Sequence, residues 1–209
     1  MIDAWLWATP NSNRVSILFE ELGLAYRVHG VNIRAREQFA AEILALNPYG
    51  KIPIVVVEEH GNREVLFESG AILIRFAERH GRFLPLEDRA RGEVLKWLMV
   101  VLTGLGPMMG QAHHWAELAS EKPEAAVRHS VGLVDRLVHV LDARLAATPY
   151  LSGGDYSIAD IAAFPWIARP GWARIDLDRF AHLKRWHDAI TVRPAVIRGM
   201  AVPAGAKLG

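Results

Sequence analysis

Three short polar stretches near the start of the chain carry the groups best suited to chemistry. In the first, Thr9-Pro10-Asn11-Ser12 is expected to join a strand to a helix, which gathers hydroxyl, side-chain amide and backbone N–H groups at a helix N-terminus. These groups donate hydrogen bonds but include no strong base, so they favour an anion, an oxyanion or a thiolate over proton abstraction. An ordinary helix cap at Asn11 or Ser12 is the alternative interpretation.

The second stretch, Asn47 to Val55, is a turn-rich loop that runs into a strand through Pro53. A proline that opens a strand cannot donate to the hydrogen-bond ladder. The sequence alone favours a trans Ile52-Pro53 bond, because only about 5–6% of such bonds are cis in folded proteins. A cis bond would instead allow the backbone of Ile52 to turn outward and pair with an extended peptide ligand.

The third stretch, Phe67-Glu68-Ser69-Gly70, ends a strand and begins a helix. Ser69 is expected to cap that helix, whose N-terminus attracts a carboxylate, and Glu68 beside it can pair with an ammonium group. Together they suit the zwitterionic end of an amino acid or peptide, although a capped helix with a solvated glutamate is the simpler alternative. The Thr9 turn is expected at the other end of the same sheet.

The elements that must position these residues form an α/β unit followed by an all-α unit. Residues 1–82 read βαβαββα, with a hairpin that joins the last two strands across a polar turn at 58–63. The expected strands span 4–8, 26–31, 54–57 and 64–67, and the expected helices begin near Asn13, Glu37 and Ser69.

Residues 90–209 lack strand-like alternation and are expected to form a helical-bundle domain after a linker that contains Pro85. The predicted helices span 90–104, 124–147, 157–168 and 178–191, with a short tail after Pro194. The sequence Ser157-Ile-Ala-Asp160 resembles a capping box. Helix 94–102 is apolar on nearly every side, so we expect a second surface to cover it.

The composition excludes several classes of function. The 209 residues include 24 Lys and Arg against 23 Asp and Glu, and this net charge of +1 does not favour nucleic acid as a partner. The absence of Cys excludes disulfides, thiolate metal sites and a cysteine nucleophile, so any thiol must arrive with a ligand. With no evident signal peptide or apolar run of about 18 residues, we expect neither export nor a membrane span. The adjacent His113 and His114 would point about 100° apart on a helix, so they predict no metal site.

Taken together, the three stretches resemble those of the cytosolic glutathione S-transferases, in which a thioredoxin-like domain precedes a helical domain. The resemblance extends over essentially the whole chain. In the second half, the segments Gly104-Leu-Gly-Pro-Met-Met-Gly-Gln-Ala-His-His114 and Tyr156-Ser-Ile-Ala-Asp-Ile161 are similar to the bacterial nu class of glutathione-dependent disulfide reductases. Trp7 and Ala8 stand where the tyrosine-dependent classes have Tyr, and the absence of Cys separates the chain from the cysteine-dependent classes.

The resemblance implies catalytic roles for Thr9 and Asn11, which would face the sulfur of glutathione and stabilise its thiolate. Glutathione would serve as the co-substrate, without a metal. In the second domain, Arg128 and the adjacent His129 are the nearest matches for a residue that reaches the ligand.

The resemblance also implies how the rest of the tripeptide is held. Glu68 and Ser69 would bind the γ-glutamyl end. Ile52, before Pro53, would pair its backbone with the cysteinyl residue. Gln38 and Lys51 would lie near the glycine carboxylate.

The favoured function is therefore that of a cytoplasmic, homodimeric enzyme that reduces disulfides with glutathione, residues 1–82 binding glutathione and residues 90–209 forming the acceptor side. Conjugation of glutathione to small electrophiles, as in detoxification, is one alternative. A non-catalytic scaffold with the same fold is another. Gln38, Lys51, Glu68 and Ser69 together argue against a scaffold, because folding alone does not need all four.

Overall fold

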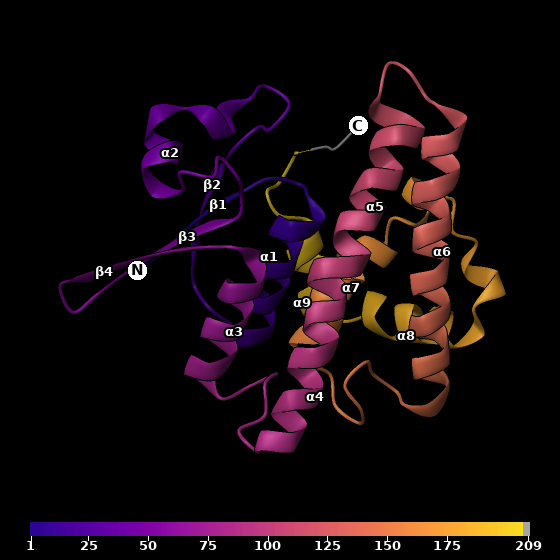
Figure 1. Cartoon of the computed structure of the whole chain (residues 1–209). Helices are drawn as coiled ribbons and strands as arrows, with labels where there is room; N and C mark the ends of the chain where they lie inside the picture. Colours follow the sequence, from indigo (N-terminus) through magenta and orange to yellow (C-terminus); the bar gives the residue numbers. More distant parts are fainter. Residues whose placement is uncertain (207–209) are drawn as a thin grey trace. The chain divides into compact units, whose positions relative to one another are not determined.

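The computed structural model describes residues 1–206, which are divided between two compact units (Figure 1). One unit comprises Met1–His80 together with the segment that begins at Arg193, and the other comprises Gly81–Val192. The order of elements is βαβαββα followed by helices. The fold class predicted from the sequence is confirmed.

The first unit is built on a four-stranded sheet in the order β2-β1-β3-β4. The strands are β1 Ile2–Leu6, β2 Arg27–Gly30, β3 Ile54–Glu59 and β4 Asn62–Phe67. β1 runs parallel to β2 and antiparallel to β3, which in turn runs antiparallel to β4. The crossover from β1 to β2 is made by a helix, as a parallel pair requires.

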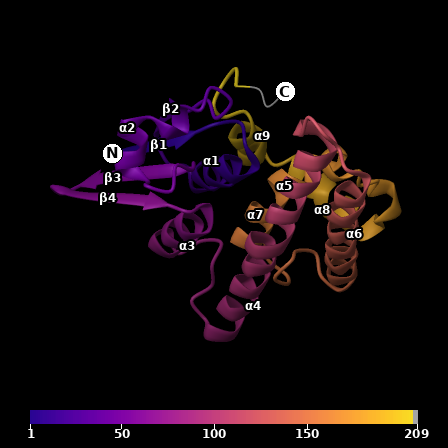
Figure 2. The ribbon, with the colours of Figure 1, turned by 45° about the horizontal axis from the view of Figure 1, so that its top comes forward.

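Helices cover both faces of this sheet. They are α1 Pro10–Leu22, α2 Ala41–Leu46, which follows the short 3-10 turn η1 Glu37–Phe39, and α3 Ser69–His80. Ile43 of α2 packs with Ile54 and Trp5 on one face. Ala4 and Leu6 alternate with Trp5 along β1 and are fully buried on the other face. Figure 2 shows α2 and α3 on opposite sides of the strands.

The hairpin between β3 and β4 is tighter than predicted. Glu59 pairs with Asn62, so only His60 and Gly61 form the loop, and both have positive φ values of 49° and 77°. Two left-handed residues in succession give the turn whose twist matches that of paired strands. The strands therefore extend into the segment predicted as a long polar turn.

The second unit consists of helices and short helical turns. They are α4 Asp88–Met99, η2 Val100–Leu105, α5 Gly106–His113, η3 His114–Leu118, α6 Glu124–Ala147, α7 Ile158–Ile167, η4 Pro170–Ala173, η5 Leu177–Arg179 and α8 Ala181–Thr191. Ser157 and Asp160 form the predicted capping box at the start of α7. Asp160 also accepts hydrogen bonds from the N–H of Leu151 at 2.9 Å and from Nε1 of Trp186 at 2.8 Å.

One helix of this unit is much longer than expected, because α4, η2, α5 and η3 run without a break over Asp88–Leu118. Its buried apolar side chains recur every three or four positions along one face: Val94, Leu98, Val101, Leu105, Met109, Ala112 and Ala116. This spacing is typical of a helix packed in a bundle. Among residues 1–206 it is the one helix that could cross a membrane by length and composition alone, a test that core helices also pass.

The last helix, α9 Pro194–Met200, belongs to the first unit and packs on α1. The sequence predicted a tail after Pro194 within a helical domain that reached residue 209. Residues 207–209 lie outside the described part of the chain. The prediction is wrong for α9. Because Gly199 has no side chain, α9 can approach the backbone of α1 closely at Ile17, and it packs there instead of in the helical unit.

Candidate functional site

Three turns of the chain lie together at one end of the strands, where β1 and β4 end and β3 begins. Because Ile54 pairs with both Trp5 and Phe67, the end of β1, the beginning of β3 and the end of β4 are aligned. The N-termini of α1 and α3 follow at the same end. The prediction that the Thr9 turn lies at the other end of the sheet from Glu68 is wrong, because two successive antiparallel pairings leave β1 and β4 running in the same direction.

The turn after β1 is built around Thr9, which is the N-cap of α1. Thr9 Oγ1 accepts a hydrogen bond from the N–H of Ser12 at 3.2 Å and donates one to Ser12 Oγ, also at 3.2 Å. Ser12 Oγ accepts a further bond from the N–H of Trp7 at 3.2 Å. The cap therefore lies at Thr9, not at Asn11 or Ser12, and the turn is held by its own hydrogen bonds.

Asn11 is the second residue of α1 and is partly exposed. Its side chain forms no hydrogen bond with another residue of the described part. The first N–H groups of a helix carry a partial positive charge, and an amide donor beside them adds to the attraction for an anion. Asn11 is thus placed to donate to an anionic atom of a ligand.

The loop before β3 touches the turn that carries Gln38. Gly50 has a φ of +63°, and a Cβ there would lie 2.8 Å from the ring of Phe39, the residue after Gln38. Gln38 Oε1 is buried without a hydrogen-bond partner among residues 1–206. Lys51 is exposed, with Nζ 5.5 Å from the centroid of the Tyr49 ring. Both side chains keep the capacity to bind a ligand.

The Ile52-Pro53 bond is cis, not trans as the sequence alone favours. The statistics of single bonds take no account of the surrounding loop, in which Asn47 Nδ2 donates to the Lys51 carbonyl at 2.8 Å. The pairing of β3 starts at Ile54, and the N–H and C=O groups of Ile52 form no hydrogen bond within the described part of the chain. This peptide unit can therefore pair with an extended ligand.

The turn after β4 holds Glu68 in the left-handed region, with a φ of 68°. This conformation costs a non-glycine residue about 1–3 kcal/mol and is retained where the surrounding structure imposes it. The Glu68 carbonyl accepts from the N–H of Ile72, which begins α3, and its side chain is exposed. Ser69 is the first residue of α3, and its Oγ accepts from Arg14 Nη1 at 3.0 Å. The prediction that Ser69 caps α3 is therefore wrong.

Arg14 of α1 is the site residue that the sequence reasoning missed. Its guanidinium is buried, and burial lowers the pKa of Arg14 to about 9 while the Glu68 carboxylate opposes the shift. Arg14 is still a cation at neutral pH, so it adds positive charge behind the two helix N-termini. The sequence held a signal: Arg14 shares a helix face with the apolar residues Ile17 and Leu18.

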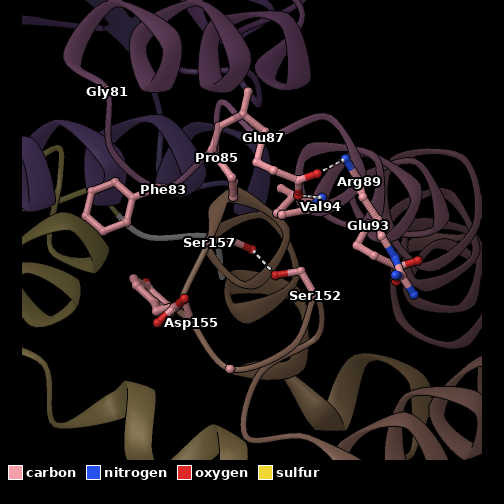
Figure 3. A pocket seen from close by; sticks show the side chains of 14 residues that line it. Gly81, Phe83, Pro85, Glu87, Arg89, Glu93, Val94, Ser152, Asp155 and Ser157 are labelled. Atoms are coloured by element: carbon pink, nitrogen blue, oxygen red, sulfur yellow. Dashed lines mark hydrogen bonds between the residues drawn. The ribbon is translucent and has the colours of Figure 1, made fainter.

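A separate cavity of about 470 Å³ lies within the helical unit, between residues 81–94 and 152–157 (Figure 3). The Glu87 carboxylate at its edge accepts from the N–H groups of Arg89 and Ala90, as the cap of α4. Ser152 Oγ donates to Ser157 Oγ at 3.0 Å. These groups are bonded within the fold, and none of the predicted site residues lines the cavity.

Two other candidates from the sequence lie in the helical unit. Arg128 of α6 forms an ion pair with Glu124, one turn earlier. His113 stacks on Trp172 with ring centroids 3.9 Å apart. No group of three or more His, Asp or Glu residues within positions 1–206 could hold a metal ion.

The mixed sheet, the helices on both of its faces and the cis-proline loop at its edge define the first unit as a thioredoxin-like domain. The family model described as "Glutathione S-transferase, N-terminal domain" matches residues 8–79, and the model described as "Glutathione S-transferase, C-terminal domain" matches residues 95–194. The chain belongs to the glutathione S-transferase family, and the resemblance noted from its sequence is confirmed.

Individual proteins that are similar to this chain indicate which members of the family it resembles. The disulfide-bond oxidoreductase YfcG of Escherichia coli K12 is 43% identical over 199 aligned residues, and the match covers 93% of this chain and 92% of YfcG. A glutathione transferase family member from Pseudomonas fluorescens, crystallised with two glutathione molecules bound, has a TM-score of 0.90 at 38% identity and is matched over 95% of this chain and 92% of its own. A glutathione transferase from Pseudomonas putida, with one glutathione disulfide bound per subunit, has a TM-score of 0.90 at 33% identity, over 97% and 91% of the two chains.

Proposed function

We propose that this protein uses glutathione to reduce disulfides. The proposal rests on three features that lie together at one end of the strands. They are the hydrogen-bond donors at the start of α1, the unpaired peptide unit of Ile52, and the Glu68 carboxylate beside the start of α3. These three features match the sulfur, the backbone and the amino-acid end of one extended tripeptide.

In this proposal, Glu68 pairs with the ammonium group of the γ-glutamyl residue, and its carboxylate binds at the N-terminus of α3 near Ser69. The buried Arg14, 3.0 Å from Ser69 Oγ, supports an anion at that place. The backbone of Ile52, before Pro53, pairs with the cysteinyl residue.

The glycine carboxylate would lie near Gln38 and Lys51. Contact between Gly50 and Phe39 brings the two segments together, which supports a shared role. The Lys51 ammonium would supply charge and the Gln38 amide would supply hydrogen bonds.

Asn11 and Thr9 would act on the sulfur. A free thiol titrates near 8.5, and each unit by which donors lower that pKa means about 1.4 kcal/mol of preferential thiolate binding. Asn11 has an uncommitted amide, whereas the Thr9 hydroxyl is bonded to Ser12 and would have to redirect its hydrogen to reach a ligand. We therefore assign the larger effect to Asn11.

The reaction would proceed by two exchanges. The bound glutathione thiolate attacks one sulfur of the acceptor disulfide, forming a mixed disulfide and releasing one acceptor thiolate, which takes up a proton. A second glutathione thiolate attacks the glutathione sulfur of the mixed disulfide, giving glutathione disulfide and the second acceptor thiol. Two glutathione molecules are oxidised as one disulfide is reduced, and the protein contributes no sulfur of its own.

Two kinds of similarity favour disulfide reduction over conjugation. YfcG, which is 43% identical, is named a disulfide-bond oxidoreductase, and the Pseudomonas putida relative holds the disulfide form of glutathione. The proposal also includes a cytoplasmic homodimer, a role in detoxification and an acceptor side formed by residues from 90 onward.

Calorimetric titration with reduced glutathione and, separately, with glutathione disulfide tests the proposal, together with turnover of a small disulfide. We expect both forms to bind and the disulfide to be reduced. Binding of the reduced form alone, without disulfide turnover, would favour conjugation to electrophiles. If neither form binds at millimolar concentration, a non-catalytic scaffold is the better description.

A further inference from the structure

The C-terminal helix is attached to α1 through buried polar groups. Ser16 Oγ donates to the carbonyl of Gly199 at 2.7 Å, and Asn13 Nδ2 donates to the same carbonyl at 3.3 Å. Asn13 Nδ2 also lies 3.4 Å from the carbonyl of Val202. Ser16 and Asn13 are fully buried, so two polar side chains of α1 serve the carbonyl end of α9.

The close packing of α9 on α1 fixes which residues of the two helices face each other. A Cβ at Gly199 would lie 2.6 Å from the backbone N and Cα of Ile17, so any larger residue would force the helices apart. At the other end of α9, Arg193 binds the almost buried Glu21 through two bonds, Nε to Oε1 at 2.6 Å and Nη2 to Oε2 at 3.0 Å. Figure 1 shows α9 alongside α1.

The residues that hold α9 also belong to the helix start that carries Asn11. The N–H of Asn13 donates to the Thr9 carbonyl at 2.9 Å, and Ser16 Oγ lies 3.2 Å from the Asn13 carbonyl. A shift of α9 would therefore be transmitted to the turn formed by Thr9 and Ser12. Arg14, which lies between Asn13 and Ser16, also connects α1 to Ser69 through Nη1 at 3.0 Å. This contact is made by the tip of a long side chain, which can follow a small shift of the helix, whereas the Thr9 turn is joined to Asn13 through the backbone.

We propose that Gly199 and Ser16 are positioning residues for the thiol site, and that docking of α9 sets the orientation of the Asn11 amide toward the sulfur. This inference rests on the proposed function. Its consequence is a separation of effects: disturbing α9 raises the pKa of bound glutathione and slows turnover, while the grip on the rest of the tripeptide is retained.

The test compares Gly199→Ala with Gly132→Ala in the full-length protein. Both substitutions favour a helix, by up to about 1 kcal/mol, but no atom lies within 4 Å of a Cβ at Gly132. We measure the ultraviolet absorbance of bound thiolate against pH, turnover of a small disulfide, and affinity for S-methylglutathione, whose blocked sulfur has no proton to lose.

For Gly199→Ala we expect the pKa of bound glutathione to rise by about one unit and turnover at neutral pH to fall about threefold to tenfold. Affinity for S-methylglutathione should stay within about twofold of that of the unmodified protein. Gly132→Ala should leave all three values unchanged. An unaltered thiol titration in a folded Gly199→Ala variant, or an equal loss of S-methylglutathione binding, would overturn the proposal.

Ser16→Ala keeps the inference testable if Gly199→Ala does not fold, since it removes the 2.7 Å hydrogen bond without a steric clash. It should shift the thiol titration in the same direction by a smaller amount, and no shift would contradict the role of Ser16. Asn11→Ala separates the two proposals. If Asn11→Ala alters the thiol pKa and the α9 variants do not, only the positioning role fails. If Asn11→Ala has no effect either, the assignment of the thiol site fails.

Discussion

Asn11 offers a side-chain amide at a helix N-terminus, and the chain has no Cys with which to replace the sulfur of a ligand. Under the proposed function, the protein's contribution to thiol chemistry is electrostatic, through donors whose benefit grows as negative charge collects on sulfur. Such a contribution has a kinetic signature, because it appears in turnover more than in ground-state affinity.

Asn11→Ala should therefore lower turnover of a small disulfide about tenfold or more, while affinity for reduced glutathione changes less than about threefold. The remaining contacts hold the tripeptide elsewhere. Steady-state kinetics and calorimetry measure the two effects. Asn62→Ala, at an exposed asparagine of β4, is the matched control and should change neither. Unchanged turnover of Asn11→Ala would contradict the assignment.

Arg14→Met should separate affinity from stability. The substitution removes a buried cation next to Ser69, so affinity for glutathione should fall about tenfold. Burying an apolar side chain of similar length is less costly than burying a guanidinium, so the melting temperature should stay the same or rise. Differential scanning calorimetry with and without glutathione checks both. A lower melting temperature with undiminished affinity would show that Arg14 serves the fold alone.

At the residue scale, the sequence predicted where the candidate residues lie along the chain, but not what their side chains bind. Lys51 and Ile52 lie in the loop predicted before β3, and Glu68 lies in the turn predicted after β4. The contacts of Gln38, Lys51, Ile52, Glu68 and Ser69 with a ligand stay predictions. Arg14 was missed because a helix position between buried residues is expected to be apolar. Ser69 was misassigned as a cap because the sequence does not show which distant side chain will reach a hydroxyl.

At the scale of elements, the α7 start shows a motif that does more than its local pattern indicates. Ser157-x-x-Asp160 predicts a capping box, which the structure contains. The donors from Leu151 and Trp186 come from outside the motif, and four hydrogen bonds converge on one buried carboxylate. Asp160 thus joins α7 to the preceding loop and to α8.

Asp160→Ala should lower the free energy of unfolding by about 2–4 kcal/mol, since buried donors lose their acceptor. Denaturant unfolding measures the change. Asp155→Ala, an exposed carboxylate in the same loop, should change stability by less than about 0.5 kcal/mol. Equal stability of the two variants would mean that neither the capping box nor the other hydrogen bonds of Asp160 stabilise the fold.

The order and type of the helices and strands could be predicted from hydrophobic periodicity and turn residues. The residues at which each element begins and ends could not. The hairpin loop consists of His60 and Gly61 because β3 and β4 stay paired as far as Glu59 and Asn62. The helix expected at 90–104 continues to Leu118. A π-helical segment, η2, lies directly before Gly106 and Pro107, and a second one, η3, ends the helix.

At the scale of the whole molecule, the family resemblance predicts a homodimer. Sedimentation velocity at micromolar concentration should give about twice the 23.3 kDa mass of one chain. Met99, which is 42% exposed on the apolar helix 94–102, leaves room for the second covering surface that the sequence predicts. A species with the mass of a single chain, stable across a tenfold dilution series, would contradict the prediction.

The assignment of α9 to the first unit was beyond sequence reasoning. Hydrophobic period and turn signals describe neighbours along the chain, whereas Asn13 and Ser16 find their acceptors at Gly199 and Val202. The sequence does place Asn13 and Ser16, two polar residues, on a helix that the fold must bury, which indicates that they have buried partners. Nothing in their spacing identifies a partner so distant in sequence.

The attachment of α9 to α1 also orders events during synthesis. A ribosome makes the sheet and its first helices, then all of Gly81–Val192, before the residues that bond to Asn13 and Ser16 exist. At about 5–20 residues per second, this interval lasts roughly 5–20 s. Throughout it the surface of α1 that α9 later covers is exposed, and Asn13 and Ser16 face water instead of the carbonyl of Gly199. The first unit is therefore completed only after the whole of the helical unit has been made.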